Sequence, residues 1–341
     1  MTVQELGEYW MRRRFEEVRA PSTMEPRCDD VGAVSPQTLA GYQTALSRII
    51  NPRLGGLRLT EARTGVVDEA LARVDLSGRT TRVARSVLVQ MFAMAVRHDA
   101  LTTNPMREVR RAPRRRRAVH ALSVEQARHL LQLTRSHHIG AARDDRGRLL
   151  GGARRTPDLH DLVLVLLGTG MRIGEALALK WADLDLHADI PYVRVAATLV
   201  EPRRDAATGQ VFVAGLHRQP MTKTGAVRTI ALPSAAVQTL NQRRARRQHE
   251  RQPVFAHAGG GWLWPNNMRT KLRGVVAGTP LVGTSPHTLR RTVGTLVAHS
   301  EGLDAARDVL GHRDPSVTAR HYIADTGRVV DVRGPLGPVF A

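Results

Sequence analysis

The sequence contains little lysine, cysteine and tyrosine for a chain of 341 residues. Three of its 51 basic residues are lysine, at positions 180, 223 and 271, and the rest are arginine. A genome that favours arginine codons explains such a bias, but the bias makes each remaining lysine worth examining. The single cysteine, Cys28, excludes a disulfide within the chain and is compatible with a reducing compartment.

Long apolar runs are also absent. The longest one, LVLVLLG at 162–168, is far too short to span a bilayer. The amino-terminal stretch MTVQELGEYWMRRRFEE has no apolar centre of the kind found in a signal peptide. We therefore expect a cytoplasmic protein without a membrane segment.

Acidic residues are too few to balance the basic ones. The 51 Lys and Arg against 31 Asp and Glu give a net charge of +20, which predicts a polyanionic partner. Nucleic acid fits better than a membrane surface, because the charge is spread along the chain and not gathered on one amphipathic helix. Hydrophobic residues make up 42%, enough for folded cores. The length suggests about two domains.

Residues 36–109 are expected to form a small helical domain, preceded by an extension, 1–35, with a helix at 5–19. Ser35 before Pro36 is typical of a helix start, with serine as N-cap and proline in the first turn. Apolar residues then recur at spacings of three and four, which indicates helices with one buried face. They are Leu39, Tyr42, Leu46 and Ile49 in one segment and Val83, Val87, Met91, Met94 and Ala95 in another.

An arginine-rich linker, 110–120, follows this domain. Six arginines lie between positions 110 and 117, interrupted by Pro113. Such a run is commonly a solvated linker. A linker that contacts phosphate is the alternative, because unshielded arginines repel one another unless an anion lies among them. The candidate DNA contacts are Arg114, Arg115, Arg116 and Arg117.

The second domain is expected over 121–325 and begins with a helix for which Ser123 is the N-cap. Residues 136–158 are polar, basic and rich in glycine, so we expect an exposed insertion there. The pair His137-His138 within it has no accompanying carboxylates or cysteines, which argues against a metal site.

The stretch GTGMRIG, 168–174, could be mistaken for a dinucleotide-binding loop. Its glycine spacing differs from G-x-G-x-x-G, and no strand–helix–strand unit surrounds it. The alternative is a turn followed by a helix from about residue 172, on which Arg172 and Glu175 share a face. Such a pair is commonly a surface ion pair, but a guanidinium held by a carboxylate is also a good phosphate clamp.

Three short β-branched segments after residue 181 predict a small antiparallel sheet: IPYVRVAATLV, QVFVAGL and AVRTIALP. In the third segment, Arg228 alternates onto the same face as Ile230 and Leu232. The glycine-containing turn MTKTGA precedes that strand, with Lys223 at its tip. Lysine can release a proton near neutral pH when its pKa is depressed, whereas arginine cannot. Lys223 is therefore either a proton donor or a chance survivor of the arginine bias.

The last third of the second domain is expected to be helical. A helix that starts at Ser285 carries His287 and Arg290 on one face near its positive end, a position that favours anions. A further helix ends at the Gly-His pair 311–312. The segment DPSVTARHYIA then begins another helix, which carries Tyr322. Taken singly, each of these histidines is more often structural.

Taken together, these residues occur in a fixed order along the chain. The set is Arg172, Lys223, His287, Arg290, His312 and Tyr322. It resembles the tyrosine recombinases, the phage-integrase family. TGMRIGEALALKWADLD is similar to the family's first-arginine box, KTGAVRTIAL to its β-hairpin lysine, HTLRRTVGTLVAH to its His-x-x-Arg box and LGHRDPSVTARHY to its closing box.

The sequence departs from this family pattern in three places. Arg291 stands where the family often has a histidine, and the basic insertion at 136–158 is unusual. No separate arm-site-binding domain of the usual size precedes residue 36, which leaves the arrangement of accessory sites open.

The resemblance implies a mainly α fold with a small antiparallel β-sheet, divided into a helical core-binding domain and a mixed α/β catalytic domain. It also implies that Tyr322 attacks a DNA phosphate, leaving a 3′-phosphotyrosine and a free 5′-hydroxyl. Lys223 would protonate the leaving 5′-oxygen, and His287 would accept the tyrosine proton.

The same resemblance assigns the charge that develops on the phosphate to Arg172, Arg290 and His312, which would bind the non-bridging oxygens. Glu175 is expected to orient Arg172 or His287. No metal ion and no nucleotide cofactor is implied.

The partners implied are double-stranded DNA carrying recombination sites and three further copies of the chain, because strand exchange joins two duplexes. An excision factor or a host DNA-bending factor is a further candidate. The tail, 326–341, has apolar residues without a core of their own. It is expected either to be disordered or to dock on a neighbouring protomer through Val329, Val330, Val332 and Phe340.

Three functions are consistent with this pattern. The first is an integrase of a phage or mobile element, and the second is a recombinase that resolves chromosome or plasmid dimers. The third is a DNA-binding regulator that has lost catalysis, against which the intact set of six residues argues. A type IB topoisomerase shares the tyrosine nucleophile but has no reason to assemble two duplexes.

Overall fold

In the computed structural model the chain forms two units, each with its own core. Unit 1 comprises Met1–Arg117 and Pro202–Gly215, and unit 2 comprises Ala118–Glu201 and Leu216–Ala341. The structure describes residues 1–19, 34–73, 79–110, 121–136, 138–139, 154–155, 157–204, 209, 211–220, 227–246, 253–311, 329–330 and 332–340. The linker arginines 114–117, His137 and the segment 312–328 lie outside these ranges.

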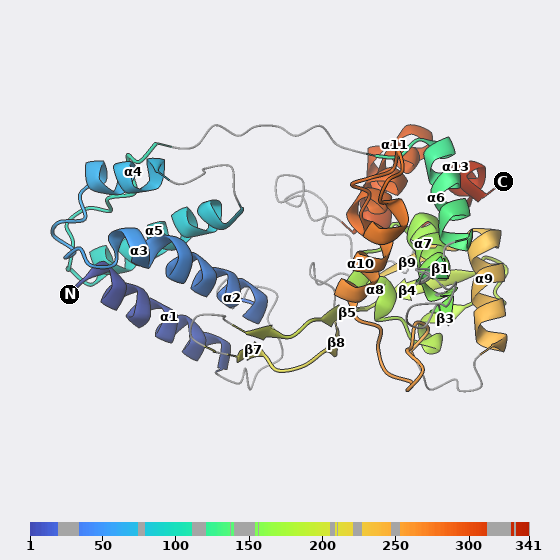
Figure 1. The fold of residues 1–341 in the computed structure, drawn as a ribbon, viewed down its shortest axis with the longest axis horizontal. Coiled ribbons are helices and arrows are strands. Elements are labelled where there is room, and N and C mark those ends of the chain that lie inside the picture. Colours follow the sequence, from blue (N-terminus) through green and yellow to red (C-terminus); the bar gives the residue numbers. More distant parts are fainter. Residues whose placement is uncertain are drawn as a thin grey trace, which may run out of the picture. The chain divides into compact units, whose positions relative to one another are not determined.

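Helices form most of unit 1 (Figure 1). As predicted, Ser35 caps the helix that begins at Pro36: its Oγ accepts a hydrogen bond from the Thr38 N–H at 3.2 Å. That helix continues through a π-helical turn, in which Asn51 donates its N–H to the carbonyl of Leu46. The helices are α1 (Val3–Arg19), α2 (Pro36–Ala45), the π turn η1 (Leu46–Ile50), α3 (Asn51–Leu54), α4 (Thr64–Ala72) and α5 (Arg79–Arg97).

The core of unit 1 forms where the apolar faces of α1, α2 and α5 meet. Trp10 on α1 packs against Tyr42 on α2 with ring centroids 5.2 Å apart. Met91 and Phe92 on α5 are fully buried in the same cluster. The extension before residue 36 therefore contributes a helix to this core, because one face of α1 supplies Val3, Leu6 and Trp10 to it.

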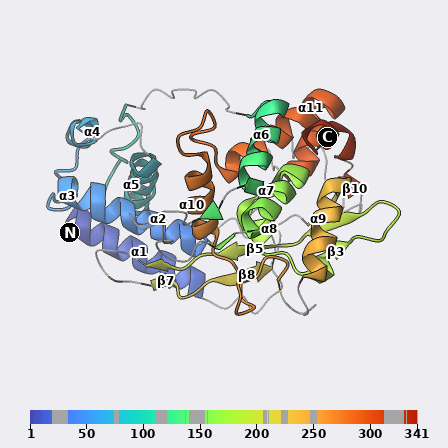
Figure 2. The same ribbon diagram turned by 45° about the vertical axis from the view of Figure 1, so that its right-hand side comes forward.

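A short β-ribbon, β6 (Arg203–Arg204) and β7 (Val211–Val213), belongs to unit 1 although it falls within the range predicted for the second domain. Figure 2 shows this ribbon beside α1 and α2. The ring of Phe212 lies 5.3 Å from that of Phe15, and Val213 is buried. A two-stranded ribbon cannot bury its own apolar side chains, so it needs the helices as a partner surface.

Unit 2 is organised around α7 (Pro157–Thr169), which packs against α6, α9 and α11 (Figure 1). Leu162, Val165 and Leu166 are all buried, so the apolar run 162–168 is a helix enclosed on every side. Of the helices in the described ranges, none is both long and apolar enough to cross a membrane. The other helices are α6 (Val124–Ser136), α8 (Ile173–Leu177), the 3-10 turn η2 (Trp181–Asp183), α9 (Ser234–Ala245), α10 (Pro265–Val276), α11 (Pro286–Leu310) and α13 (Arg333–Phe340).

Two of the three segments predicted to form a small sheet do so in unit 2, whereas the third, QVFVAGL, contributes β7 to the ribbon of unit 1. The strand order of the sheet in unit 2 is β10-β9-β4-β3, and both β3 and β9 pair antiparallel with β4. A second antiparallel ladder pairs β5, which follows β4 in the chain, with β8, which precedes β9. A two-residue pair, β1 with β2, lies within the insertion. The strands are β1 (His138–Ile139), β2 (Arg154–Arg155), β3 (Leu184–Asp185), β4 (Tyr192–Val195), β5 (Ala197–Val200), β8 (His217–Pro220), β9 (Arg228–Ala231) and β10 (Val329–Val330).

The strand register fixes both ends of the segment that contains Lys223. Pro220 at the end of β8 pairs with Ala197, and Arg228 at the start of β9 pairs with Val195. The described residues on either side of this segment, Pro220 and Arg228, therefore pair with positions two residues apart on the same stretch of chain. Lys223 itself lies outside the described residues.

The described part of the tail packs on unit 2 of its own chain. β10 pairs parallel with β9, and Val332, Leu336 and Val339 are buried in the core of unit 2. The apolar pattern alone predicts either disorder or docking of this segment on a neighbouring protomer. In the single chain, the hydrophobic core of the same domain covers these side chains, so they are buried without a second protomer.

Candidate active site

The turn between α7 and α8 places Arg172 at the start of a short helix. Gly170 in this turn has a φ of 64°, and a Cβ there would lie 3.0 Å from Val293 Cγ1, so the position requires glycine. Arg172 follows as the N-cap of α8, with an extended backbone. α8 ends at Leu177, before the chain turns into η2.

Glu175 holds Arg172 by both its backbone and its side chain. Its Oε2 accepts the Arg172 N–H at 2.9 Å, and its Oε1 accepts a hydrogen bond from Arg172 Nη1 at 2.7 Å. The Glu175 side chain is 1% exposed, whereas that of Arg172 is 29% exposed. The guanidinium is therefore anchored on one side and accessible on the other, which is the arrangement that a phosphate clamp needs.

Close packing of α8 on β5 fixes the position of this pair. A Cβ on Gly174 would lie 2.7 Å from Thr198 Oγ1 and 3.3 Å from the carbonyl oxygen of Leu199. We expect Gly174→Ala to destabilise the protein by about 1–3 kcal/mol, because either α8 or β5 must move. Thermal or urea unfolding measures the change.

Gly274 provides the matched control for this substitution. It lies in α10, and a Cβ there meets nothing within 4 Å. Gly274→Ala should leave stability unchanged or raise it by about 0.5–1 kcal/mol, since alanine is the better helix former. Equal unfolding midpoints for the two variants would contradict the close approach of α8 to β5.

Arg290 is buried on α11, close to the turn that carries Arg172. As predicted, Ser285 caps this helix through a hydrogen bond that its Oγ accepts from the Thr288 N–H at 3.2 Å. Arg290 Nη1 donates to the carbonyl of Gly170 at 2.7 Å, and Nη2 donates to the carbonyl of Leu310. Burial, reinforced by the charge of Arg172, lowers the pKa of Arg290 to about 9, so its guanidinium remains protonated at neutral pH.

His287 lies one helical turn before Arg290 and is exposed. Partial burial lowers the pKa of its imidazole, and the positive charges of Arg291, Arg290 and Arg172 lower it further. These charges keep the ring neutral at pH 7, which leaves a nitrogen able to accept a proton. Arg172, His287 and Arg290 therefore share one electrostatic neighbourhood, although they come from α8 and α11.

Arg228 on β9 is a member of this cluster that the sequence motifs do not identify. Its Nη2 donates to Glu175 Oε2 at 2.6 Å, and its Nε donates to the carbonyl of Val309 at 2.9 Å. One signal is present in the sequence: Arg228 alternates onto the strand face of Ile230 and Leu232, and all three are buried. An arginine on an apolar strand face must have a buried partner, and that partner is Glu175.

The described residues bring together part of the predicted set. Arg172, Glu175, His287 and Arg290 meet at the junction of α8 with the two ends of α11. Lys223, His312 and Tyr322 lie outside the described residues. Two of these have described neighbours at this junction, since Arg228 begins the strand after Lys223 and Gly311 directly precedes His312.

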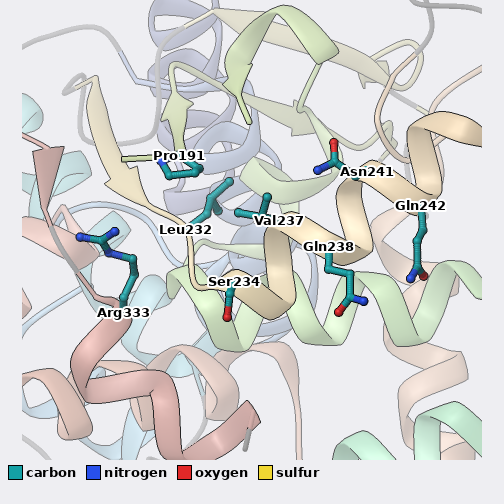
Figure 3. Close-up of a pocket in the computed structure, with 8 residues that line it drawn as sticks. All are labelled: Pro191, Leu232, Ser234, Val237, Gln238, Asn241, Gln242 and Arg333. Carbon is teal, nitrogen blue, oxygen red and sulfur yellow. The ribbon is translucent and has the colours of Figure 1, made fainter. Parts of the chain in front are cut away.

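A separate cavity of about 500 Å³ lies between α9, the end of β9 and the start of α13 (Figure 3). None of the candidate site residues that the structure describes lines it, and its wall mixes apolar side chains with the amides of α9. The cluster of arginines lies elsewhere in unit 2, where α8 meets α11. The lining residues are Pro191, Leu232, Ser234, Val237, Gln238, Asn241, Gln242 and Arg333.

The chemistry that this cluster supports is the binding of an oxyanion. The guanidinium groups of Arg172 and Arg228 bind one buried carboxylate, that of Glu175, and the guanidinium of Arg290 lies within electrostatic range of it. One carboxylate cannot balance three cations, so a net positive charge remains where Arg172 reaches solvent. Preorganised charge of this kind stabilises the anion that develops during a phosphoryl transfer.

Comparison with solved structures shows the same fold. The Tn1549 transposon integrase in complex with a circular intermediate DNA matches with a TM-score of 0.69 at 18% identity, over 96% of each chain. A lambda integrase tetramer bound to a Holliday junction matches with a TM-score of 0.60 at 16% identity, over 95% of this chain and 80% of that one. The two-domain tyrosine-recombinase architecture predicted from the sequence is thereby confirmed.

Curated relatives point in the same direction. A XerC-like tyrosine recombinase of Caldanaerobacter subterraneus is 27% identical over 180 residues, which cover 48% of this chain and 45% of that protein. The tyrosine recombinase XerC of Alcanivorax borkumensis is 24% identical over 289 residues, 84% of this chain and 82% of the relative. The chain thus spans less than half of the first relative and most of the second.

A family model described as the phage integrase family matches residues 148–328, which include every candidate catalytic residue from Arg172 to Tyr322. The match covers more than half of the chain. It extends over the arginine cluster described above and over the segments that hold Lys223, His312 and Tyr322. On this evidence the chain belongs to the phage integrase family.

Proposed function

We propose that the protein is a site-specific DNA recombinase that cuts and rejoins DNA through a covalent tyrosine intermediate. The observation that carries this proposal is the preorganised cluster of Arg172, Glu175 and Arg290 within the stretch matched by the family model. An oxyanion at the exposed side of Arg172 would meet fixed positive charge without any rearrangement.

In the proposed reaction, Tyr322 Oη attacks the scissile phosphorus and the bond from phosphorus to the 5′-oxygen breaks. The product is a 3′-phosphotyrosine and a free 5′-hydroxyl, so the energy of the phosphodiester is kept in the new bond. The 5′-hydroxyl of a second strand then attacks the phosphotyrosine, which restores a phosphodiester and frees the tyrosine. Arg172, Arg290 and His312 would hold the non-bridging oxygens in both steps.

Two proton transfers accompany each step. Lys223 would donate a proton to the departing 5′-oxygen, and the neutral imidazole of His287 would accept the proton of Tyr322. In the second step Lys223 would take a proton from the attacking 5′-hydroxyl, and His287 would return its proton to the oxygen of Tyr322. The lowered pKa of His287 supports its part, because a neutral ring is ready at physiological pH.

The direct test is the capture of the intermediate. A nicked duplex carrying a site selected by affinity from random sequence is incubated with the protein, and covalent adducts are separated by denaturing electrophoresis. Mass spectrometry of the digested adduct should locate the nucleotide on Tyr322. Joined products from two labelled duplexes would identify a recombinase and exclude a topoisomerase. A protein that binds its selected site tightly but forms no adduct would be a regulator and would contradict the proposal.

The pH profile of cleavage should follow His287. Because burial and the neighbouring arginines lower its pKa below 6.5, the single-turnover rate should stay level as pH falls through 6.5. It should then decline about tenfold per pH unit below that lowered pKa. Arg291→Gln removes one of those charges, so it should raise the pKa and move the acid limb to higher pH.

Arg307→Gln is the control for that shift. Arg307 lies on the same helix, is paired with Asp304 and is not among the charges that act on His287. Its profile should coincide with that of the unmodified protein. An acid limb that stays in place in Arg291→Gln would show that His287 does not set it.

We further propose that the active form is a tetramer on double-stranded DNA, in the cytoplasm, and that its role is integration or excision of a mobile element. The lambda integrase tetramer on a Holliday junction supports the stoichiometry by analogy. The resolution of chromosome or plasmid dimers is the alternative role with the same chemistry.

Arg114–Arg117 are proposed to follow the DNA backbone. Replacing them with glutamine should reduce the salt dependence of binding by about one unit for each phosphate that the variant no longer neutralises.

A further inference from the structure

Arg228 ties together three chain segments of the candidate site. Through Nη2 it binds Glu175 on α8 at 2.6 Å, and through Nε it binds the carbonyl of Val309 on α11 at 2.9 Å. Its own backbone begins β9, the strand that follows the Lys223 segment. Its side chain is 7% exposed, so the guanidinium is held inside the domain and not presented to solvent.

Arg228 also lies directly against the residue before His312. Gly311 ends α11 with a φ of 59°, and a Cβ there would lie 3.2 Å from both Cδ and Nη1 of Arg228. Nη1 has no hydrogen-bond partner in the part of the chain that the structure describes. A substitution at Arg228 would therefore disturb the end of α11 as well as the carboxylate.

The binding of Glu175 by Arg228 determines which hydrogen-bond donors of the Arg172 guanidinium remain free. Glu175 Oε2 accepts from Arg228 and from the Arg172 backbone, so Oε1 alone is left for the Arg172 guanidinium. Arg172 is consequently bound through one nitrogen and not through the two-pronged pair that arginine and carboxylate readily form. Its other donors stay available for a phosphate oxygen.

The charge state of Glu175 depends on the same contact. Burial alone would raise the pKa of this carboxyl group, but the charge and hydrogen bond of Arg228, together with the hydrogen bonds from Arg172, lower it overall. Without Arg228, the buried carboxylate would have Arg172 as its one remaining cationic partner among the described residues. Arg172 would then be drawn into a tighter pair with Glu175 and away from the phosphate.

We propose that Arg228 is a positioning residue of the recombination chemistry, a role that rests on the function proposed above. It occupies one oxygen of Glu175 so that Arg172 can bind the scissile phosphate. It also fixes the end of α11, from which His312 follows, relative to the strand that follows Lys223. It does not touch the substrate and transfers no proton.

The test compares Arg228→Met and Arg228→Lys with the unmodified protein on a nicked duplex. The readouts are the unfolding midpoint, the Kd for DNA and the single-turnover rate of adduct formation at saturating protein. We expect Arg228→Met to slow adduct formation by about 10- to 100-fold, the range found when a residue that orients a reactive group is removed. The Kd should be unchanged, because a buried guanidinium contributes no phosphate contact.

Arg228→Lys keeps the charge and guards against a variant that fails to fold. An ammonium can pair with Glu175 but cannot also reach the Val309 carbonyl in the geometry of the guanidinium, so the rate should fall less than in Arg228→Met. Arg243→Met is the matched control. Arg243 is equally buried and binds two carboxylates, Asp158 and Asp161, at 2.5 and 2.9 Å. The Arg243→Met substitution should lower stability but leave the cleavage rate of folded protein unchanged.

A chemical probe separates positioning from a general loss of structure. In a duplex with a methylphosphonate at the cleavage site, a methyl group replaces one charged oxygen, so the arginine clamp is needed less. The defect of Arg228→Met should shrink on this substrate. An equal defect on both substrates, or an unmodified rate in Arg228→Lys, would overturn the proposal. Failure of the unmodified protein to form any adduct would instead contradict the proposed function.

Discussion

Tyr322→Phe should abolish the covalent adduct while leaving DNA binding intact. The substitution removes one oxygen atom, the proposed nucleophile, and changes neither the charge nor the volume of the side chain appreciably. We expect adduct formation to fall by at least about 10⁴-fold, because the variant lacks the proposed nucleophile. The Kd for DNA should stay within a small factor, since the phosphate contacts come from basic residues.

Tyr192→Phe is the control for this loss. Tyr192 lies on β4 and is half-buried, so its substitution makes the same chemical change away from the arginine cluster. It should form the adduct at the unmodified rate. An adduct that persists in Tyr322→Phe, with the nucleotide found on another residue, would show that the nucleophile has been misassigned.

Arg290→Ala should slow cleavage by about 10²- to 10³-fold, the loss typical when one preorganised donor to a developing anion is removed. It should also destabilise the fold, because the carbonyl oxygens of Gly170 and Leu310 lose their buried donor. Each unsatisfied carbonyl costs about 1–3 kcal/mol. Arg290→Lys restores a charge but cannot span both carbonyls, so it should recover stability in part and cleavage only slightly. Rates are measured in single turnover on folded protein, alongside urea unfolding.

The adjacent Arg291→Ala provides the comparison. Arg291 is exposed, one position along the same helix, and its charge acts on His287. At pH 8, where His287 is neutral in either protein, Arg291→Ala should cleave within a few-fold of the unmodified rate. If both alanine variants lost activity to the same extent, the effect would reflect the positive surface of α11 and not the clamp made by Arg290.

Local signals in the sequence predicted many of the structural elements correctly. Ser35, Ser123 and Ser285 each accept a hydrogen bond from a first-turn N–H, as N-caps do, and Gly311 ends α11 in the left-handed conformation. These features depend on residues within four positions of one another, so the sequence contains all the information that determines them. The strands around 192–200 and 228–231 were also predicted, because the alternation of β-branched residues is a local pattern in the sequence.

Two contacts between distant segments, outside the predicted site, were not predicted. The ribbon β6–β7 packs with unit 1 because Phe212 finds Phe15, nearly 200 positions earlier in the chain. The tail covers the core of unit 2 because Val332 and Leu336 fit against helices far upstream. Apolar composition indicated that the tail needed a partner, whereas the segment that forms β7 was predicted in the sheet of the second domain. In both cases the partner depends on which surfaces the rest of the fold leaves uncovered.

The sequence by itself determined the family, the order of the catalytic candidates and the need for an anionic partner. It did so because residue types and their order are one-dimensional properties of the chain. The tertiary structure alone decided that the Glu175 carboxylate binds both Arg172 and Arg228. Arg172 lies three residues away from that carboxylate and Arg228 lies 53 positions away, yet both bind it within 2.7 Å. A carboxylate buried between two arginines exists only after α8, β9 and α11 have packed, because burial and convergence are properties of the folded core.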